Sequence, residues 1–496
     1  MVYFAQTVLP PIEPTGIANQ NAWNRTRVQN WQHSVNGRID HRFNDKDSIW
    51  VRYSGFFNPG KGAASLPSQA RTSNGRAHNL AGNWVHTFGP GAVFQYQFGR
   101  VYQWTASWDH YRSLPSDFAS KVGYSANVVT PYVDGNTYYP GFNPSGFFSS
   151  QEQWNVSRTG DSWHHRLGFS KLVGSHMFKI GAEYNRVQWY YENGVTSIGF
   201  ANAQTADPLR IGSTGSALAS FLLNVPDGAT RRDIIETMPW WGGVIGFYLQ
   251  DSWKATNRFT VNMGLRYDRT FIPTAGTDDH NNNFAGDMNY LNGTYILQTM
   301  APSCGSGVTK GGCIPTPAGA PAGWLPANVV VADGGKVWHD TTKNFQPRLG
   351  FAYRLGSNTV IRASSGIFFD NYSGVTQIAR NFIGTYPALG WQSAANLNYP
   401  STSAPLPTIS GFNPLPSATL PVADPFTQST YSGDPNWKNA YSIQWNFGFQ
   451  HQLAQGFLLS ANYVGSGSRR TDIGGRYGTA LYPAPDGGKT GRRSRT

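Results

Sequence analysis

The sequence predicts an all-β fold, part of an antiparallel transmembrane β-barrel of about twelve strands with short periplasmic turns and long extracellular loops. Three observations carry this prediction. Apolar and polar residues alternate over runs that are long enough to cross a membrane, which takes about 9–11 residues. Turns of two or three residues alternate strictly with long connections. Charged residues make up only 13% of the chain, about half the share in an ordinary globular domain.

The clearest alternation runs from Phe259 to Asp268, and a second run begins at Tyr441. Successive side chains of a strand point to opposite faces, so each run has one apolar and one polar face. In a membrane barrel the first faces lipid and the second faces the lumen. The candidate lipid-facing residues are Phe259, Val261, Met263, Leu265, Tyr267, Ile443, Trp445 and Phe447. The candidate lumen-facing residues are Arg52, Asn262, Arg266, Arg348, Arg354, Gln444, Asn446 and Gln450.

Six hairpins are predicted, each closed by a short turn that contains Gly, Asn, Asp, Ser or Pro, or Ala beside a polar residue. They cover Trp31–Phe57, Arg76–Gln103, Ser162–Tyr190, Gly242–Thr270, Phe345–Asp370 and Ala440–Gly465. Most connections between them run to tens of residues, which is uncommon in a compact soluble domain. All short turns therefore lie at one end of the sheet and all long loops at the other, as in outer-membrane barrels.

Composition narrows the class of protein. No apolar run reaches about 18 residues, so no transmembrane helix is predicted. The net charge of +12 is spread over the strands as single Lys and Arg residues. This spacing favours lumen and headgroup charges over nucleic-acid binding, which requires a basic patch. We expect the chain to reside in the outer membrane of a Gram-negative bacterium, with outer-membrane lipid as a partner and no nucleic acid.

The two cysteines, Cys304 and Cys313, lie in one segment rich in Gly and Pro. Such a short-range pair predicts a disulfide in an oxidising compartment. A metal site is the alternative, but it needs more ligands and no His is adjacent.

Three segments are expected along the chain. Residues 1–30 form an N-terminal loop or strand remnant, and residues 31–470 form the partial barrel. Residues 471–496 form an irregular tail that is truncated or read in an altered frame. A secretion signal is expected upstream, because the first residues lack a charged and then apolar start. One short helix is expected within a loop, at Gly215–Leu223.

Four hairpin sequences resemble one family. Tyr248–Asp268 (YLQDSWKATNRFTVNMGLRYD) is similar to a hairpin of TonB-dependent outer-membrane receptors. Phe345–Asp370, Asn439–Arg470 and Asn36–Ser54 resemble hairpins of the Oar-like branch of that family. Each motif is weak alone, but the four occur in order and cover most strands.

The resemblance implies a barrel of about 22 strands, closed by an N-terminal plug. It also implies active import of a bulky substrate, with the TonB complex contacted through an N-terminal box. This chain resembles only the barrel, as a fragment without the plug. It is expected to meet TonB only through that missing part, and to meet an unknown substrate (siderophore, glycan or peptide) at the extracellular loops.

No catalytic constellation is present, so the chain is not expected to be an enzyme, and neither a cofactor nor a bound metal is predicted. His164 and His165 point to opposite faces of a strand and cannot share one metal. The oxygen-rich segment Asp278–Asn281 lacks the spacing of a calcium loop. The lumen-facing residues either face a plug and a substrate path, or only solvate the lumen and pair with one another.

Two other functions remain open. The first is a passive porin or adhesin barrel without TonB coupling. The second is a soluble all-β carbohydrate-binding protein, in which exposed Trp and Tyr act as sugar platforms. The Trp and Tyr residues near strand ends otherwise fit an interfacial girdle, with Trp253, Tyr267, Trp445 and Tyr463 as examples.

Overall fold

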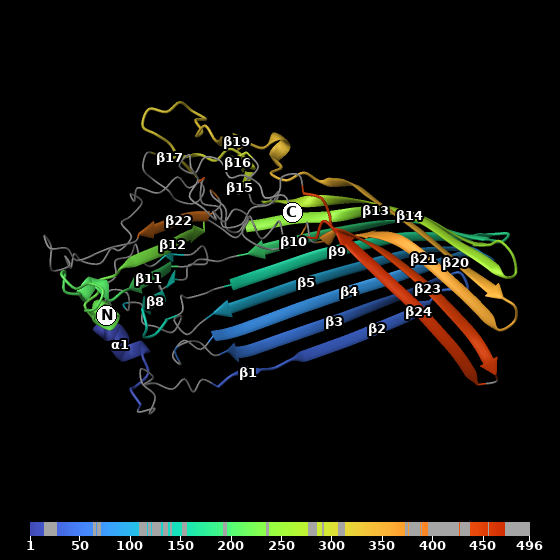
Figure 1. The fold of residues 1–496 in the computed structure, drawn as a ribbon, viewed down its shortest axis with the longest axis horizontal. Helices are drawn as coiled ribbons and strands as arrows, with labels where there is room; N and C mark the ends of the chain where they lie inside the picture. The colour runs from blue at the N-terminus through green and yellow to red at the C-terminus, as the bar shows by residue number, and fades with distance from the viewer. Residues whose placement is uncertain are drawn as a thin grey trace.

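A computed structural model of the chain contains one large antiparallel sheet with loops gathered at one end (Figure 1). The structure describes residues 1–13, 27–62, 66, 71–108, 117, 121, 130–131, 137–138, 141–150, 156–191, 196–234, 238–275, 285–289, 292–305, 313–372, 375, 387, 389–394, 426, 437–454 and 456–471. Among these residues, no helix has the length and apolar character needed to cross a bilayer.

The large sheet confirms the predicted antiparallel fold. Its strands are β1 (Gln29–Asn30), β2 (His33–Arg42), β3 (Asp47–Gly62), β4 (Arg71–Gly89), β5 (Ala92–Trp108), β9 (Val156–Val173), β10 (His176–Tyr191), β13 (Met238–Lys254), β14 (Phe259–Ala275), β20 (Thr341–Leu355), β21 (Thr359–Phe369), β23 (Tyr441–Ala454) and β24 (Phe457–Arg469). Strands β1 and β2 both pair with the same side of β3, so the 13-stranded sheet is twelve strands wide. Within the described residues it does not close into a barrel, because β24 does not pair with β1 or β2.

All six predicted hairpins are present, and most strands are longer than predicted. Strand β4 has 19 residues and β5 has 17. Strand β10, whose alternation is poor in the sequence, pairs without interruption with β9 and β13 along its whole length. Its neighbours on both sides fix its register, so a regular strand forms despite an irregular pattern.

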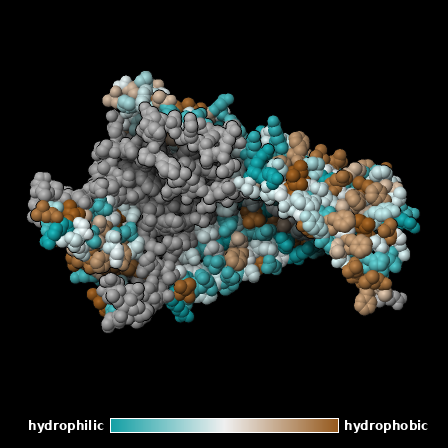
Figure 2. All heavy atoms as spheres, viewed as in Figure 1, coloured by the Kyte–Doolittle hydropathy of each residue, from teal (hydrophilic) through white to brown (hydrophobic). Residues whose placement is uncertain are grey.

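The sheet has two faces of different character. Residues opposite each other on neighbouring strands share a face, so the pairing defines the faces through the whole sheet. The apolar face carries exposed Leu, Ile, Phe, Trp, Tyr, Val or Met side chains on β3, β4, β9, β10, β13, β14, β20 and β23, and half-buried aromatic and aliphatic side chains on β5 and β21. The opposite, polar face carries Arg, Asn, Gln, Ser and Gly. In Figure 2 apolar side chains gather at the end that carries the short turns of β20–β24.

A second, smaller sheet lies in the loops. It combines β22 (Leu389–Ala394), β12 (Gly228–Ile234), β11 (Thr196–Phe200) and β8 (Gly141–Pro144). Helix α1 (Val2–Val8) packs on it through Phe4, whose ring lies 4.7 Å from that of Phe142 and 5.8 Å from that of Phe221. Residues 2–8 are therefore helical, not the loop or strand remnant expected for the start of the chain, because this helix buries Phe4 and Val8 against a loop core.

Phe221 belongs to α3 (Ala217–Leu222), the short helix that the sequence predicts within residues 215–223. The side chain of Ser216 caps its N-terminus by accepting a hydrogen bond from the amide of Ala219. A 3-10 turn, η3 (Ala203–Thr205), precedes it and joins it through the Thr205 hydroxyl.

A third group of short strands follows β14. It comprises β15 (Gly286–Asn289), β16 (Thr294–Leu297), β17 (Ser303–Gly305), β18 (Ile314–Pro315), β19 (Val329–Val331) and the 3-10 turn η4 (Asp333–Gly335), while β6 (Thr130–Pro131) and β7 (Thr137–Tyr138) pair earlier in the chain. Two apolar cores lie here, one around Trp338 and one around Tyr295 and Leu297. These loops thus contain apolar cores of their own.

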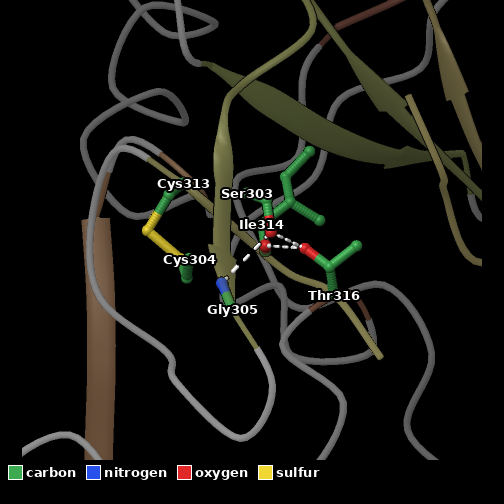
Figure 3. The surroundings of a disulfide bond; sticks show 6 residues. All are labelled: Ser303, Cys304, Gly305, Cys313, Ile314 and Thr316. Carbon is green, nitrogen blue, oxygen red and sulfur yellow. Dashed lines mark hydrogen bonds between the residues drawn. A yellow bond between two sulfur atoms is a disulfide. The ribbon is translucent and has the colours of Figure 1, made fainter. Parts of the chain in front are cut away.

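Cys304 and Cys313 form a disulfide within this group (Figure 3). The bond lies beside the pairing of β17 with β18, where Ser303 pairs with Ile314 and its hydroxyl contacts that of Thr316. The covalent link therefore closes the same short loop that the two strands close by hydrogen bonds.

Candidate functional site on the polar face

The structure places the sixteen candidate wall residues on two faces. The eight candidate lumen residues, from Arg52 on β3 to Gln450 on β23, all lie on the polar face. The eight candidate lipid residues all lie on the apolar face, where Leu265 is 49% and Phe447 is 50% exposed. Trp50, an aromatic residue on the polar face, lies beneath the guanidinium of Arg38 at 4.8 Å.

The polar face is cross-linked at Arg266. Its Nη1 donates to Glu183 Oε2 at 2.7 Å, and its Nε donates to Asp268 Oδ2 at 3.0 Å. Glu183 also lies 2.8 Å from the Nε2 of His164. Arg266 and Glu183 keep only 22% and 21% of their side-chain surface exposed. This group of Glu183, Arg266, Asp268 and His164, here called the Arg266 node, joins β9, β10 and β14.

Amide side chains surround Asp268, the buried acid of the Arg266 node. Asp268 is fully buried, and its carboxylate accepts hydrogen bonds from Gln346 and from Asn371 Nδ2, the latter at 2.6 Å. Asn344 Nδ2 donates to the Asp268 carbonyl at 3.1 Å. The donors come from β20 and from the residue that follows β21. Asp268 therefore links β14 to β20 and to the segment after β21.

Asn371 extends the network toward the loops. Its Oδ1 accepts from Thr270 Oγ1 at 3.3 Å and from Asn439 Nδ2 at 3.0 Å. Asn371 follows β21 and Asn439 precedes β23, so both ends of the long connection between these strands meet at β14. Next to them, Asn185 donates to the Tyr372 hydroxyl at 2.7 Å, and desolvation by burial raises the pKa of this phenol.

Gly246 on β13 gives Arg266 its path to Glu183. In the pairing, Gly246 lies between Glu183 on β10 and Asp268 on β14. A Cβ at this position would meet the Asp268 carboxylate and would come within 2.8 Å of Arg266 Nη2. The missing side chain therefore leaves the space in which the guanidinium crosses β13.

Tyr248 uses neighbouring glycines in the same way. A Cβ on Gly181 would lie 2.5 Å from the Tyr248 ring, and one on Gly168 would lie 3.3 Å from its hydroxyl. The ring therefore lies flat over β10 toward β9, where the Arg166 guanidinium stands 5.6 Å from its centroid. Long side chains run across the strands on this face, over positions that have no side chain of their own.

Cations outnumber carboxylates on the polar face. Among the side chains that the structure describes on the large sheet, ten Lys and Arg residues and three acids occupy this face. The cations are Arg38, Arg42, Arg52, Arg166, Lys179, Lys254, Arg266, Arg348, Arg354 and Arg362, and the acids are Asp40, Glu183 and Asp268. Arg348 and Arg362 have no carboxylate partner among the described residues. The face therefore presents a net positive surface.

Sequence reasoning missed Glu183, Asn371 and Asn439. Glu183 lies in the least regular strand pattern, and the two asparagines flank a long loop. The two histidines point to opposite faces, as predicted: His164 contacts Glu183, and His165 contacts the Tyr96 hydroxyl at 2.9 Å on the apolar face.

Within the described part of the chain, no three His, Cys, Asp or Glu residues are grouped as metal ligands. Residues 278–281, weighed above as a cation loop, lie outside the described residues. The node itself does not offer a vacant ligand set, because its acids already accept hydrogen bonds from Arg266 and the amides.

Several solved structures resemble this chain at low identity. The alcaligin outer membrane receptor FauA of Bordetella pertussis is 7% identical, with 88% of this chain and 44% of that chain covered at a TM-score of 0.39. The ferric-catecholate import receptor Fiu of Escherichia coli K12 is 11% identical, with 89% and 52% covered at 0.40. The outer membrane transporter YddB of Escherichia coli is 11% identical, with 88% and 40% covered at 0.45. The chain thus spans about half the length of these proteins.

A comparison with curated protein sequences finds no match. A family model described as outer membrane beta barrel domain, in contrast, matches residues 3–495. This match covers nearly the whole sequence, and it agrees with a two-faced antiparallel sheet that has short turns at one end. The chain therefore belongs to the outer membrane β-barrel domain family.

Proposed function

We propose that this chain forms part of the barrel wall of a TonB-dependent outer-membrane receptor of the Oar-like branch, which imports a bulky substrate. One observation carries the proposal: hairpins that resemble this family build a sheet with an exposed apolar face and a cross-linked polar face. The apolar face meets lipid, and the polar face lines the lumen toward a plug or a passing substrate. The loops at the far end meet the substrate first.

The charge of the polar face suggests the kind of cargo. Ten cations against three acids give this wall a positive potential, which attracts anions and repels cations in a confined path. We infer that the imported substrate is anionic. Arg348 and Arg362 are two candidates to contact it, because neither is neutralised by a described carboxylate; they share this property with other cations of the face, such as Arg166 and Arg354.

Planar-bilayer conductance of the full-length gene product tests the transporter. A receptor with a plug holds the pore closed until urea unfolds the plug, whereas a porin conducts steadily from the start. Binding of the purified periplasmic domain of TonB to the full-length protein is the second readout. Steady conductance without urea, together with no TonB binding, would establish the passive porin instead.

The same conductance recording tests whether the pore favours an anionic substrate. In a KCl gradient the urea-opened pore should favour chloride, and the Arg348→Gln/Arg362→Gln variant should shift the reversal potential toward potassium. Asn262→Ser, an uncharged change on the same face, is the control. A wild-type pore that prefers potassium would contradict the anionic cargo but leave the transporter proposal standing.

The soluble carbohydrate-binding alternative does not fit membership of an outer-membrane family. Partition between water and a detergent phase checks this point directly, since an exposed apolar face of this size drives the protein into detergent.

A further inference from the structure

Arginine and tryptophan alternate along one line of the apolar face. Arg100 on β5 pairs with Trp163 on β9, which pairs with Arg186 on β10. The line then continues through Gly243 on β13 to Phe271 on β14. Residues in one such line share a face and a level in the sheet. The residues Arg100, Trp163 and Arg186, together with Trp241 beside them, are here called the Arg–Trp strip.

The strip lies at the edge of the apolar band. On β13 the band extends from Trp253, next to a short turn, to Gly243, which pairs with Arg186 of the strip. Ten residues of strand measure about 33 Å, or about 25 Å across a bilayer at the usual tilt. That height equals the apolar band of outer-membrane barrels, which is about 25 Å. The strip therefore stands at the level of the lipid headgroups, on the side of the long loops.

Aromatic rings hold both guanidinium groups of the strip. Arg100 lies 4.5 Å from the centroid of the Trp163 ring, and Arg186 lies 5.6 Å from that of Trp241. Stacking of this kind fixes the plane of the guanidinium and leaves its edge free for oxygen acceptors. Trp241 itself is 39% exposed on this face.

The two arginines differ in their partners. Arg100 forms a two-point ion pair with Asp161, at 3.0 and 2.8 Å. Arg186 forms no ion pair with a described carboxylate, and its Nε is buried without a hydrogen-bond acceptor. A charged donor group at a headgroup surface is stabilised by an anion that supplies acceptor oxygens.

The opposite edge of the apolar band has different charges. There Asp251 pairs with His176 at 2.7 Å, and Asp47 pairs with His86 at 2.7 Å. The His176 ring stacks between Phe178 and Trp253. At the loop side of the band, Arg186 has no described carboxylate partner. The turn side presents carboxylates held by histidines, together with the exposed Lys171 in the row of Asp251, so the two edges of the band differ in their charged groups.

We propose that the Arg–Trp strip binds the phosphate groups of anionic lipid headgroups in the leaflet on the loop side of the sheet. Arg186 supplies the main contact. Arg100, whose charge is largely neutralised by Asp161, adds only the donor groups that this ion pair leaves unused. Arg269, two positions before Phe271, extends the positive edge onto β14, although Asp340 neutralises part of its charge at 3.0 Å. The proposal concerns the lipid side of the wall and does not depend on the imported substrate.

Native mass spectrometry of the full chain in detergent tests the proposal, with diphosphoryl lipid A as the probe and a non-phosphorylated glycolipid for comparison. Each Arg near a headgroup surface contributes about 1 kcal/mol, so Arg186→Gln should weaken lipid A binding about fivefold and Arg100→Gln/Arg186→Gln further. Lys179→Gln removes one cation from the polar face of β10, the strand that carries Arg186, and should leave binding unchanged. Arg186→Lys keeps the charge and should restore most of the affinity.

Heat modifiability on electrophoresis verifies that each variant is folded. Equal lipid A binding by the double variant and the wild type would overturn the proposal, as would equal binding of the non-phosphorylated glycolipid. Release of lipid A by millimolar inorganic phosphate would assign the strip to free phosphate and also overturn it. If the glutamine variants do not fold, lipid A binding of the wild type must still fall with NaCl, and salt-independent binding contradicts the proposal.

Discussion

Arg266 on β14 reaches Glu183 on β10 at 2.7 Å although β13 lies between their strands. Two residues 83 positions apart in the sequence thus form an ion pair over an intervening strand. The pair is possible because residue 246 is glycine. This relationship fixes three strands of the polar face to one another, and it gives the first two predictions.

Gly246→Ala should destabilise the sheet by about 1–3 kcal/mol, the usual cost of forcing an extra methyl group into a filled space. The new Cβ would displace the Arg266 guanidinium and the Asp268 carboxylate. Urea unfolding in detergent measures the loss. Gly264→Ala is the matched control, because its Cβ would meet nothing closer than the Leu249 carbonyl at 3.6 Å. Equal losses at both positions would contradict this account of Gly246.

The costs of Glu183→Gln and Arg266→Gln should not add. Arg266→Gln should cost more, because it leaves both Glu183 and Asp268 without their cation, whereas Arg266 keeps Asp268 when Glu183 is replaced. Removing one member of a largely buried ion pair leaves an uncompensated charge, at a cost of about 3–5 kcal/mol in fully buried cases. Both side chains here are about one-fifth exposed, so we expect about 1–3 kcal/mol for each single change. A double-mutant cycle in urea measures the coupling, and a coupling energy of zero would show that the pair contributes nothing.

Adjacent residues of β21 should lie in different solvents. Ala363 belongs to the apolar face and Ser364 to the polar face, where Asn446 donates to its hydroxyl at 2.7 Å. Spin-labelled lipid should quench a fluorophore on Ala363→Cys but not one on Ser364→Cys. Ala363 and Ser364 are neighbours in the chain but point to opposite faces of the sheet, so each labelled variant is the control for the other. Quenching of the Ser364→Cys label alone would reverse the assignment of lipid and lumen.

The disulfide should stabilise its loop and not the sheet. Cys304→Ser removes the link that closes β17 and β18, so trypsin should cleave faster after Lys310, between the two cysteines. The urea midpoint of the large sheet should stay unchanged, since no strand of that sheet contains either cysteine. The Cys304→Ser/Cys313→Ser variant should behave like the single one, and a lower urea midpoint in both would show that the loop supports the sheet.

The sequence was sufficient to predict the two faces and the six hairpins. A strand between two solvents needs only a two-residue period, and Phe259–Asp268 shows that period without a break. Tight turns with Gly and Asn then fix which strands are neighbours. These features are local, so they can be recognised before the fold is known.

The contacts of the node could not be predicted in this way. Glu183 meets Arg266 only because of the register of three strands and the missing side chain at Gly246. Asn371 and Asn439 meet because the segment between them returns to the same strand. A glycine inside a strand is a signal of close approach, and Gly246 was the available clue. Helix α1 gave no clue, because its seven residues are too few to show a helical period.

The loop sheet has a consequence for how this surface can evolve. Strands β8, β11, β12 and β22 come from three separate connections between barrel hairpins, and they pair edge to edge as β22-β12-β11-β8. An insertion in one connection would shift the register of its neighbours, so sequence drift in one must be matched in the others. Antibodies, phages and colicin-like toxins that select for change at such a surface would therefore meet one epitope whose three connections must change together, and not three independent epitopes.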